Sequence, residues 1–247
     1  MSIYGRIAPW YDALFPVGEA QAAFFQRLLR EAHCRSVLDV GCGTGRHLEL
    51  FAGWGLTVGG LEPEAEMAAK ATERLADAGL RAELAVCGLE EALEAFPKAY
   101  DAAVCLGNTL AHLDTPSRLV AGLNVLARLL KPWGLLVTQT VNFDAVLREG
   151  RSAFPERRIE DPEKGPLVFR RRYLFDGAPE RLLFRLELTG EALHLREEIP
   201  LRPYSCQDQK VLIESCGFRI EQTYGDWDGS AHAADSPAII LVARRSR

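Results

Sequence analysis

Along the first 141 positions, short continuous apolar runs alternate with segments whose apolar residues recur at helical spacing. Five short apolar runs indicate buried strands, at 36–40, 56–61, 81–86, 100–106 and 135–141. Between them, apolar positions at helical spacing predict helices over 20–32, 46–54, 64–78 and 115–130. Thr115 followed by Pro116 is a typical helix start, and Gly79 is a typical helix end. Strands that alternate with helices predict a mainly parallel sheet covered on both faces.

Residues 167–199 follow a different pattern. Apolar and polar residues alternate in three runs separated by short turns, at 167–175, 182–188 and 193–199. This alternation predicts an antiparallel meander, which we interpret as an insertion over one edge of the parallel sheet. Helix signals at Ser205, Asp208 and Gly217 then predict a return to the α/β rhythm, with two last strands at 218–224 and 238–243.

Composition narrows the class of protein. The net charge of −5 argues against a general nucleic-acid binder, and no apolar run is long enough to predict a membrane-spanning helix. The first fifteen residues lack the pattern of a secretory signal, and the six cysteines show no C-x-x-C spacing. We therefore expect free thiols, a cytoplasmic location, no metal site, and neither a nucleic-acid nor a membrane partner.

The run VLDVGCGTG at residues 37–45 indicates a ligand site. An apolar strand ends in Asp39, glycines follow at 41, 43 and 45, and a predicted helix comes next. Glycine permits positive φ and a close approach of backbone to ligand, and a helix start presents free N–H groups. Glu62 closes the next strand, where a carboxylate can accept hydrogen bonds from ribose hydroxyls. Arg46 breaks both the dinucleotide and the phosphate-loop patterns, so those two alternatives are disfavoured.

This motif, with an acidic residue closing the next strand, resembles the class I S-adenosylmethionine (SAM) dependent methyltransferases. Residues 102–113 (AAVCLGNTLAHL) and 129–144 (LLKPWGLLVTQTVNFD) are similar to the glycine and sarcosine N-methyltransferase group. Residues 225–245 resemble the carboxyl-terminal hairpin of the same small-molecule group. The resemblance covers nearly the whole chain.

The resemblance implies a fold and a cofactor. The implied fold is α/β, with a Rossmann-like, seven-stranded, mostly parallel sheet, helices on both faces, and an antiparallel β insertion after the fifth strand. The cofactor is SAM and the product S-adenosylhomocysteine (SAH). One methyltransferase domain is expected over 1–247. Its parts are an N-terminal helical lid (1–34), a SAM-binding core (35–145), a substrate-covering insertion (150–203), and a closing helix with β-hairpin (204–247).

The resemblance also implies roles for single residues. Asp39 and Gly41 line the methionine part of SAM, Glu62 holds the ribose, and Met67 lies near adenine. Tyr4, Trp10 and Tyr11 form an aromatic lid, with core packing as the alternative for Trp10 and Tyr11. The implied cofactor-binding residues are Tyr11, Asp39, Gly41, Cys42, Gly43, Gly45, Glu62, Pro63, Met67, Cys87, Gly88, Leu89, Leu106, Gly107 and Asn108.

Methyl transfer from a sulfonium is an in-line displacement, in which the protein mainly aligns donor and acceptor. His112 and Tyr11 are the candidate catalytic bases, and a purely structural histidine is the alternative for His112. The candidate substrate-binding residues are Asn108, His112, Asn142, Arg172 and Tyr204.

The acceptor is expected to be a small molecule with an N or O nucleophile. Glycine itself is disfavoured, because Val141 stands where glycine-methylating relatives have a basic residue. The arginines at 170–172 alternate between the two faces of a predicted strand, which favours an exposed edge strand over an RNA-binding patch. A catalytically silent SAM-binding regulatory protein remains the alternative function.

Overall fold

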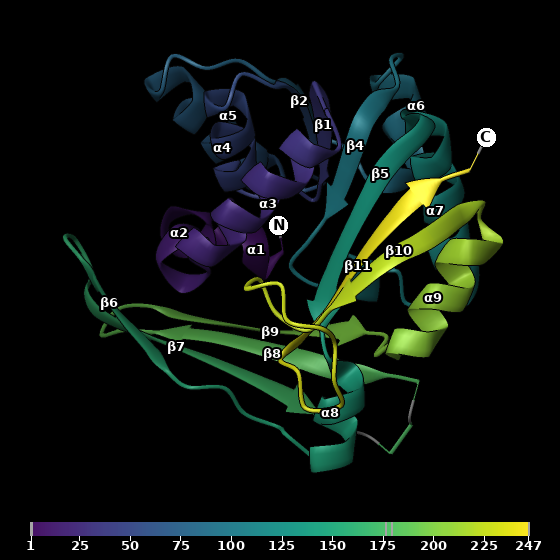
Figure 1. Ribbon diagram of the computed structural model, residues 1–247. Coiled ribbons are helices and arrows are strands. Elements are labelled where there is room, and N and C mark those ends of the chain that lie inside the picture. Colours follow the sequence, from purple (N-terminus) through teal and green to yellow (C-terminus); the bar gives the residue numbers. More distant parts are fainter. Residues whose placement is uncertain (1, 176, 179, 247) are drawn as a thin grey trace.

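Two separate β-sheets organise the protein, whose computed structural model describes residues 2–175, 177–178 and 180–246. Within those ranges the larger sheet has seven strands in the order β10-β11-β5-β4-β1-β2-β3 (Figure 1). They are β1 (Ser36–Val40), β2 (Thr57–Leu61), β3 (Glu83–Ala85), β4 (Tyr100–Cys105), β5 (Leu130–Val141), β10 (Phe218–Tyr224) and β11 (Ala238–Arg245). β11 runs antiparallel to both its neighbours, and the other neighbouring strands pair in parallel. The predicted mostly parallel sheet is confirmed.

Helices cover both faces of this sheet (Figure 1). One face carries α3 (Glu19–Glu31), α4 (Arg46–Gly53) and α5 (Ala65–Asp77), and the other carries α6 (Ala92–Ala95), α7 (Pro116–Leu129) and α9 (Cys206–Ser215). Successive residues of a strand therefore pack on opposite faces of the sheet: Val37 belongs to the core beneath α3, α4 and α5, and Leu38 to the core beneath α6, α7 and α9. This two-sided burial explains why the parallel strands are continuous apolar runs.

Local signals in the sequence set the helix ends. The Thr115 side chain accepts a hydrogen bond from the Arg118 N–H at the start of α7, and Ser205 and Asp208 form a capping box on α9. β5 begins at Leu130 instead of the predicted residue 135. Its pairing with β4 is irregular there, and Trp133 has a φ of +65°.

The second sheet is antiparallel and lies across the carboxyl ends of the parallel strands (Figure 1). Its strands, in sheet order, are β6 (Arg157–Asp161), β7 (Gly165–Leu174), β8 (Leu182–Thr189) and β9 (His194–Leu201). α8 (Phe143–Glu149) precedes it in the chain. Its apolar face packs against the amino-terminal elements α1 (Ile3–Ile7), η1 (Ala8–Trp10) and α2 (Tyr11–Leu14). The predicted meander after the fifth strand is thus confirmed.

The expectation that residues 170–172 lie on an exposed edge strand is wrong. β7 pairs with β8 along one edge, and along the other it pairs with β6 over residues 165–169 and with residues 152–154 at Arg171 to Tyr173, so both its edges are covered. β6 escaped prediction because its sequence, RRIED, contains a single apolar residue and shows no alternation that indicates a strand. Arg171 is half-buried and lies on the face opposite Arg170 and Arg172.

Candidate active site

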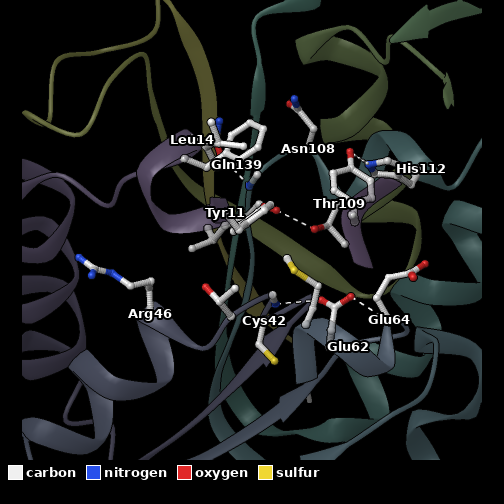
Figure 2. Close-up of a pocket in the computed structure, with 18 of the residues that line it drawn as sticks. Tyr11, Leu14, Cys42, Arg46, Glu62, Glu64, Asn108, Thr109, His112 and Gln139 are labelled. Atoms are coloured by element: carbon white, nitrogen blue, oxygen red, sulfur yellow. Dashed lines mark hydrogen bonds between the residues drawn. The ribbon is translucent and has the colours of Figure 1, made fainter. Parts of the chain in front are cut away.

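A cavity of about 650 Å³ lies where the parallel strands end. Its walls come from the glycine loop after β1, the loop after β4, the amino-terminal helices and the inner face of the second sheet. Figure 2 shows Tyr11 between Glu62 on one side of the cavity and Asn108 on the other. Residues from four distant parts of the sequence therefore share one space.

The glycine loop needs glycine at each of its three positions for conformational reasons. Gly41, Gly43 and Gly45 all have positive φ, between +57° and +78°. A Cβ at Gly41 would lie 2.9 Å from Thr109 Oγ1 across the cavity wall. A Cβ at Gly45 would lie 2.8 Å from the Cβ of Ala71 on α5. Gly41 and Gly43 line the cavity, whereas Gly45 allows α4 and α5 to pack closely.

The Glu62 carboxylate is buried at the end of β2 and faces the loop. Its Oε2 accepts a hydrogen bond from the Gly43 N–H at 2.8 Å, and its Oε1 accepts one from the Glu64 N–H at 3.1 Å (Figure 2). Burial raises the pKa of Glu62, and the two N–H groups oppose that rise. Each oxygen keeps a further lone pair for hydroxyl donors such as those of a ribose.

Asp39 is the most conspicuous unsatisfied group in the site. Its side chain is 2% exposed, and its Oδ2 has no hydrogen-bond partner among the described residues. Burial, and then the nearby Glu62 carboxylate, raise the pKa of Asp39 to about 8. A buried carboxylate without a partner is costly unless a cation or a proton neutralises it. The cavity is therefore built to receive positive charge beside Asp39.

The amino-terminal helices are tied to both sheets. The Thr44 hydroxyl donates to Asp12 Oδ1 at 2.5 Å, and Arg74 forms an ion pair with the same carboxylate. Trp10 Nε1 donates to Asp161 Oδ2 of β6 at 2.6 Å. These contacts hold Tyr11 over the glycine loop, where it lines the cavity.

The far wall of the cavity carries His112 and Tyr4. His112 Nε2 lies 3.4 Å from Tyr4 Oη, and burial lowers the pKa of His112 to about 4. The imidazole is thus neutral near pH 7 and has one nitrogen able to accept a proton. Burial raises the pKa of Tyr11, so its phenol stays protonated at that pH. This difference favours His112 over Tyr11 as a base.

The loop after β4 is rigidly supported. Asn108 adopts positive φ, +70°, and its Oδ1 accepts a hydrogen bond from the Val141 N–H at 2.6 Å. Gln139 Oε1 accepts one from the Gly107 N–H at 2.9 Å. Asn108 also lines the cavity.

Most predicted site residues converge on the cavity, and some do not. Lining residues from the predicted set are Tyr11, Asp39, Gly41, Cys42, Gly43, Glu62, Pro63, Met67, Leu106, Gly107, Asn108 and His112. Residues of the set outside the lining are Gly45, Cys87, Gly88, Leu89, Asn142, Arg172 and Tyr204.

Three of the outlying residues have other contacts. Asn142 caps α8 and donates to the carbonyls of Ala234 and Ser236. The Tyr204 hydroxyl donates to the Leu113 carbonyl at 2.7 Å. Arg172 is exposed on the outer face of β7. Their roles as substrate ligands remain predictions that this geometry does not favour.

Several cavity residues escaped the sequence analysis. They are Thr109 and Gln139 at the strand ends, and Arg157, Arg171 and Glu197 on the second sheet. The alternation of β7 indicated Arg171, since it is two positions from Tyr173, which also lines the cavity, and so lies on the same face. Arg172, the residue predicted to bind substrate, lies on the opposite face.

The described residues contain no group of three or more His, Cys, Asp or Glu side chains arranged to hold a metal ion. In the same part of the chain, every helix is too short or too polar to cross a membrane.

Residues 37–134 match a family model described as a methyltransferase domain. A SAM-dependent methyltransferase from Clostridium acetobutylicum has the same fold, with a TM-score of 0.82 at 15% identity over the full length of both chains. The fold, the glycine motif and the match to the methyltransferase family model support assignment to the class I SAM-dependent methyltransferases.

Similarity to one curated methyltransferase extends over nearly the whole chain. The chain is 26% identical to a glycine/sarcosine N-methyltransferase of Aphanothece halophytica, over 98% of this chain and 89% of that protein. A ubiquinone biosynthesis O-methyltransferase of Sodalis glossinidius is 37% identical, over 44% of this chain and 42% of that protein.

The residues of the cavity fit SAM. Asp39 offers an unpartnered, buried carboxylate for a cationic amino group, and Glu62 offers acceptors for two hydroxyls. Gly41 and Gly43 have positive φ and carry no side chains, so the backbone of the loop can approach the bound ligand closely.

Proposed function

We propose that this chain transfers the methyl group of SAM to a nitrogen or oxygen nucleophile of a small molecule. The observation that carries this proposal is the single cavity that joins the glycine loop to the inner face of the second sheet. Its volume, about 650 Å³, is within the range of small-molecule sites. Two of the similar proteins named above are an N-methyltransferase and an O-methyltransferase, which agrees with the proposal.

Cofactor binding is assigned to the half of the cavity near β1 and β2. Asp39 pairs with the amino group of SAM, Glu62 accepts from the ribose hydroxyls, and Met67 packs against the adenine. When bound, SAM supplies a methyl group activated by a positively charged sulfur. Gly45 supports this half indirectly, by allowing α4 to pack on α5.

Acceptor binding is assigned to the half formed by the β4 loop and the second sheet. His112 is neutral near pH 7 and takes the proton that an amine or hydroxyl loses on methylation. The Tyr4 hydroxyl, 3.4 Å from His112 Nε2, orients the imidazole. The Asn108 amide donates to the acceptor. Correct alignment of the reacting atoms supplies most of the rate enhancement.

The four-part division of the chain follows from the same assignment. Residues 1–34 act as a lid that excludes water, because Tyr11 lies over the cavity. Residues 35–145 bind SAM, 150–203 cover the acceptor, and 204–247 complete the sheet. We further propose a reducing, cytoplasmic location, since all six cysteines are free. The net charge of −5 disfavours nucleic-acid and anionic-membrane partners.

Calorimetric titration of SAM and SAH into the wild type and Glu62→Ala tests the cofactor assignment. We expect micromolar binding that the variant weakens by about tenfold to a hundredfold, the usual range for lost charge-assisted hydrogen bonds. A panel of small amines, amino acids and phenols is then tested for transfer of labelled methyl from SAM. Binding without turnover on any acceptor would favour the silent regulatory protein, which no observation above supports.

A further inference from the structure

Two arginines face the acceptor half of the cavity without an anionic partner. Arg157 on β6 and Arg171 on β7 both line the cavity, and neither forms an ion pair with any described residue. They lie near enough for Arg157 to help lower the pKa of Arg171, although burial is the larger cause. Two neighbouring cations in a partly buried site repel each other unless an anion lies between them.

Aromatic rings hold the Arg171 guanidinium in place. Its Cζ lies 4.9 Å from the ring centre of Phe154, 5.6 Å from that of Phe15 and 5.8 Å from that of Phe169. The ring faces stabilise the positive charge but cannot accept hydrogen bonds from all five N–H groups of the guanidinium. Arg171 Nε is buried and has no acceptor among the described residues. The guanidinium is thus positioned, charged and unsatisfied.

A third unsatisfied donor lies on the same face. Tyr173 is 1% exposed, lines the cavity, and its hydroxyl has no hydrogen-bond partner among the described residues. It is two positions from Arg171 along β7, so both side chains point the same way. Such buried polar groups without partners are rare in folded proteins and call for an explanation.

The acidic side chain that the second sheet contributes to the cavity lining is already engaged. Arg171 on β7 pairs with Leu186 on β8, and Leu186 pairs with Glu197 on β9. The Glu197 carboxylate therefore belongs to a strand two places away from that of Arg171. It accepts a hydrogen bond from Arg6 Nη2 at 3.2 Å. The arginine pair is therefore not neutralised from within the sheet.

We infer that Arg157, Arg171 and Tyr173 form a subsite for an oxyanion of the methyl acceptor, either a carboxylate or a phosphate. The inference rests on the proposed function, because it places the anion on the acceptor. Arg171 supplies a fork of donors, Tyr173 adds an O–H donor, and Arg157 adds charge. The acceptor is thereby held by its anionic end while its nucleophile points toward the β4 loop.

The test uses the full-length chain saturated with SAH. Sodium acetate and sodium phosphate are titrated at constant ionic strength, with binding followed by thermal unfolding and calorimetry. We expect saturable stabilisation by an oxyanion and none by methylammonium chloride. Tighter binding of acetate assigns a carboxylate to the acceptor, and tighter binding of phosphate assigns a phosphate.

Matched variants separate this subsite from general charge effects. Arg171→Gln should weaken oxyanion binding by about tenfold to a hundredfold. Arg158→Gln removes the same charge from the exposed face of β6 and should leave binding within about twofold. Tyr173→Phe keeps the ring contacts with Phe154 and should weaken binding by about threefold to tenfold.

The outcomes distinguish the two levels of inference. A wild type that fails to bind SAH overturns the proposed function itself. A wild type that binds SAH but shows no saturable response to either oxyanion overturns the subsite alone, as does an equal response in Arg171→Gln. If Arg171→Gln does not fold, judged by loss of SAH binding, Tyr173→Phe and Arg157→Gln decide the question.

Discussion

Replacing Asp39 by asparagine should stabilise the ligand-free protein and impair cofactor binding. Burial and the Glu62 carboxylate raise the pKa of Asp39 from its ordinary value of 3.8 to about 8. Between these two values the folded state holds a proton that the unfolded chain has released. Stability contributed by this protonated site is complete below about pH 4 and is lost as the pH rises toward 8.

The size of this effect follows from the pKa difference. The difference between a pKa of 3.8 and one of about 8 lowers the free energy of unfolding by between about 5 and 6 kcal/mol from pH 4 to above pH 8. By pH 7 the loss is about 4 kcal/mol. In the wild type, the free energy of unfolding should therefore fall by about 1.4 kcal/mol per pH unit between these pKa values. The asparagine side chain of Asp39→Asn does not titrate, so this variant should lack that slope. Part of the gain is offset because the new amide N–H₂ also lacks a partner.

Urea unfolding of both proteins from pH 4 to pH 8, without ligand, measures the slope. Calorimetry in buffers of different ionisation enthalpy measures the proton released on SAM binding. In the wild type, affinity should rise by about tenfold per unit between pH 5 and pH 7, with close to one proton released. Asp39→Asn should bind SAM at least about tenfold more weakly and release none. Parallel stability curves, or binding without proton release in the wild type, would refute the assignment of Asp39.

Three further perturbations test other parts of the site. Glu62→Gln should weaken SAH binding less than Glu62→Ala does, because it keeps one oxygen for the Gly43 or Glu64 N–H; calorimetry of both variants makes the comparison. Gly45→Ala should lose about 1–3 kcal/mol of stability in urea, since a Cβ there would contact Ala71 at 2.8 Å and the backbone has φ of +78°. His112→Gln should lower kcat by about tenfold to a hundredfold and abolish any activity limb near pH 4, while SAH affinity stays unchanged. An unchanged kcat would make His112 a structural residue.

The cofactor half was predictable because its determinants are local in sequence. The glycine loop, Asp39 and Glu62 all lie within 26 residues, on two strands that the α/β rhythm makes neighbours. Register then places Asp39 beside Gly60, two residues before Glu62. The order and register of two neighbouring strands are therefore enough to bring Asp39, the glycine loop and Glu62 together.

The acceptor half depends on pairings that no local pattern specifies. β6 is too polar to be recognised, yet it brings Arg157 to the cavity and covers the edge of β7. Arg171 and Arg172 look alike in the sequence, and only the facing of β7 against the amino-terminal helices decides which one lines the cavity. Tyr4 and His112 meet from positions 108 residues apart.

The two halves of the cavity differ in the sign of the charge that their unpartnered groups carry when ionised. Near β1 the unpartnered group is the carboxylate of Asp39, and on the second sheet it is the guanidinium of Arg171. A cation gains by entering the first half and loses in the second, and an anion does the reverse. If the cavity takes cationic SAM and an anionic acceptor, as proposed, each ligand is directed to its own end, and their reacting groups meet between Tyr11 and Asn108. The same unpartnered groups destabilise the ligand-free protein, so ligand binding should stabilise it more than burial of apolar surface alone would.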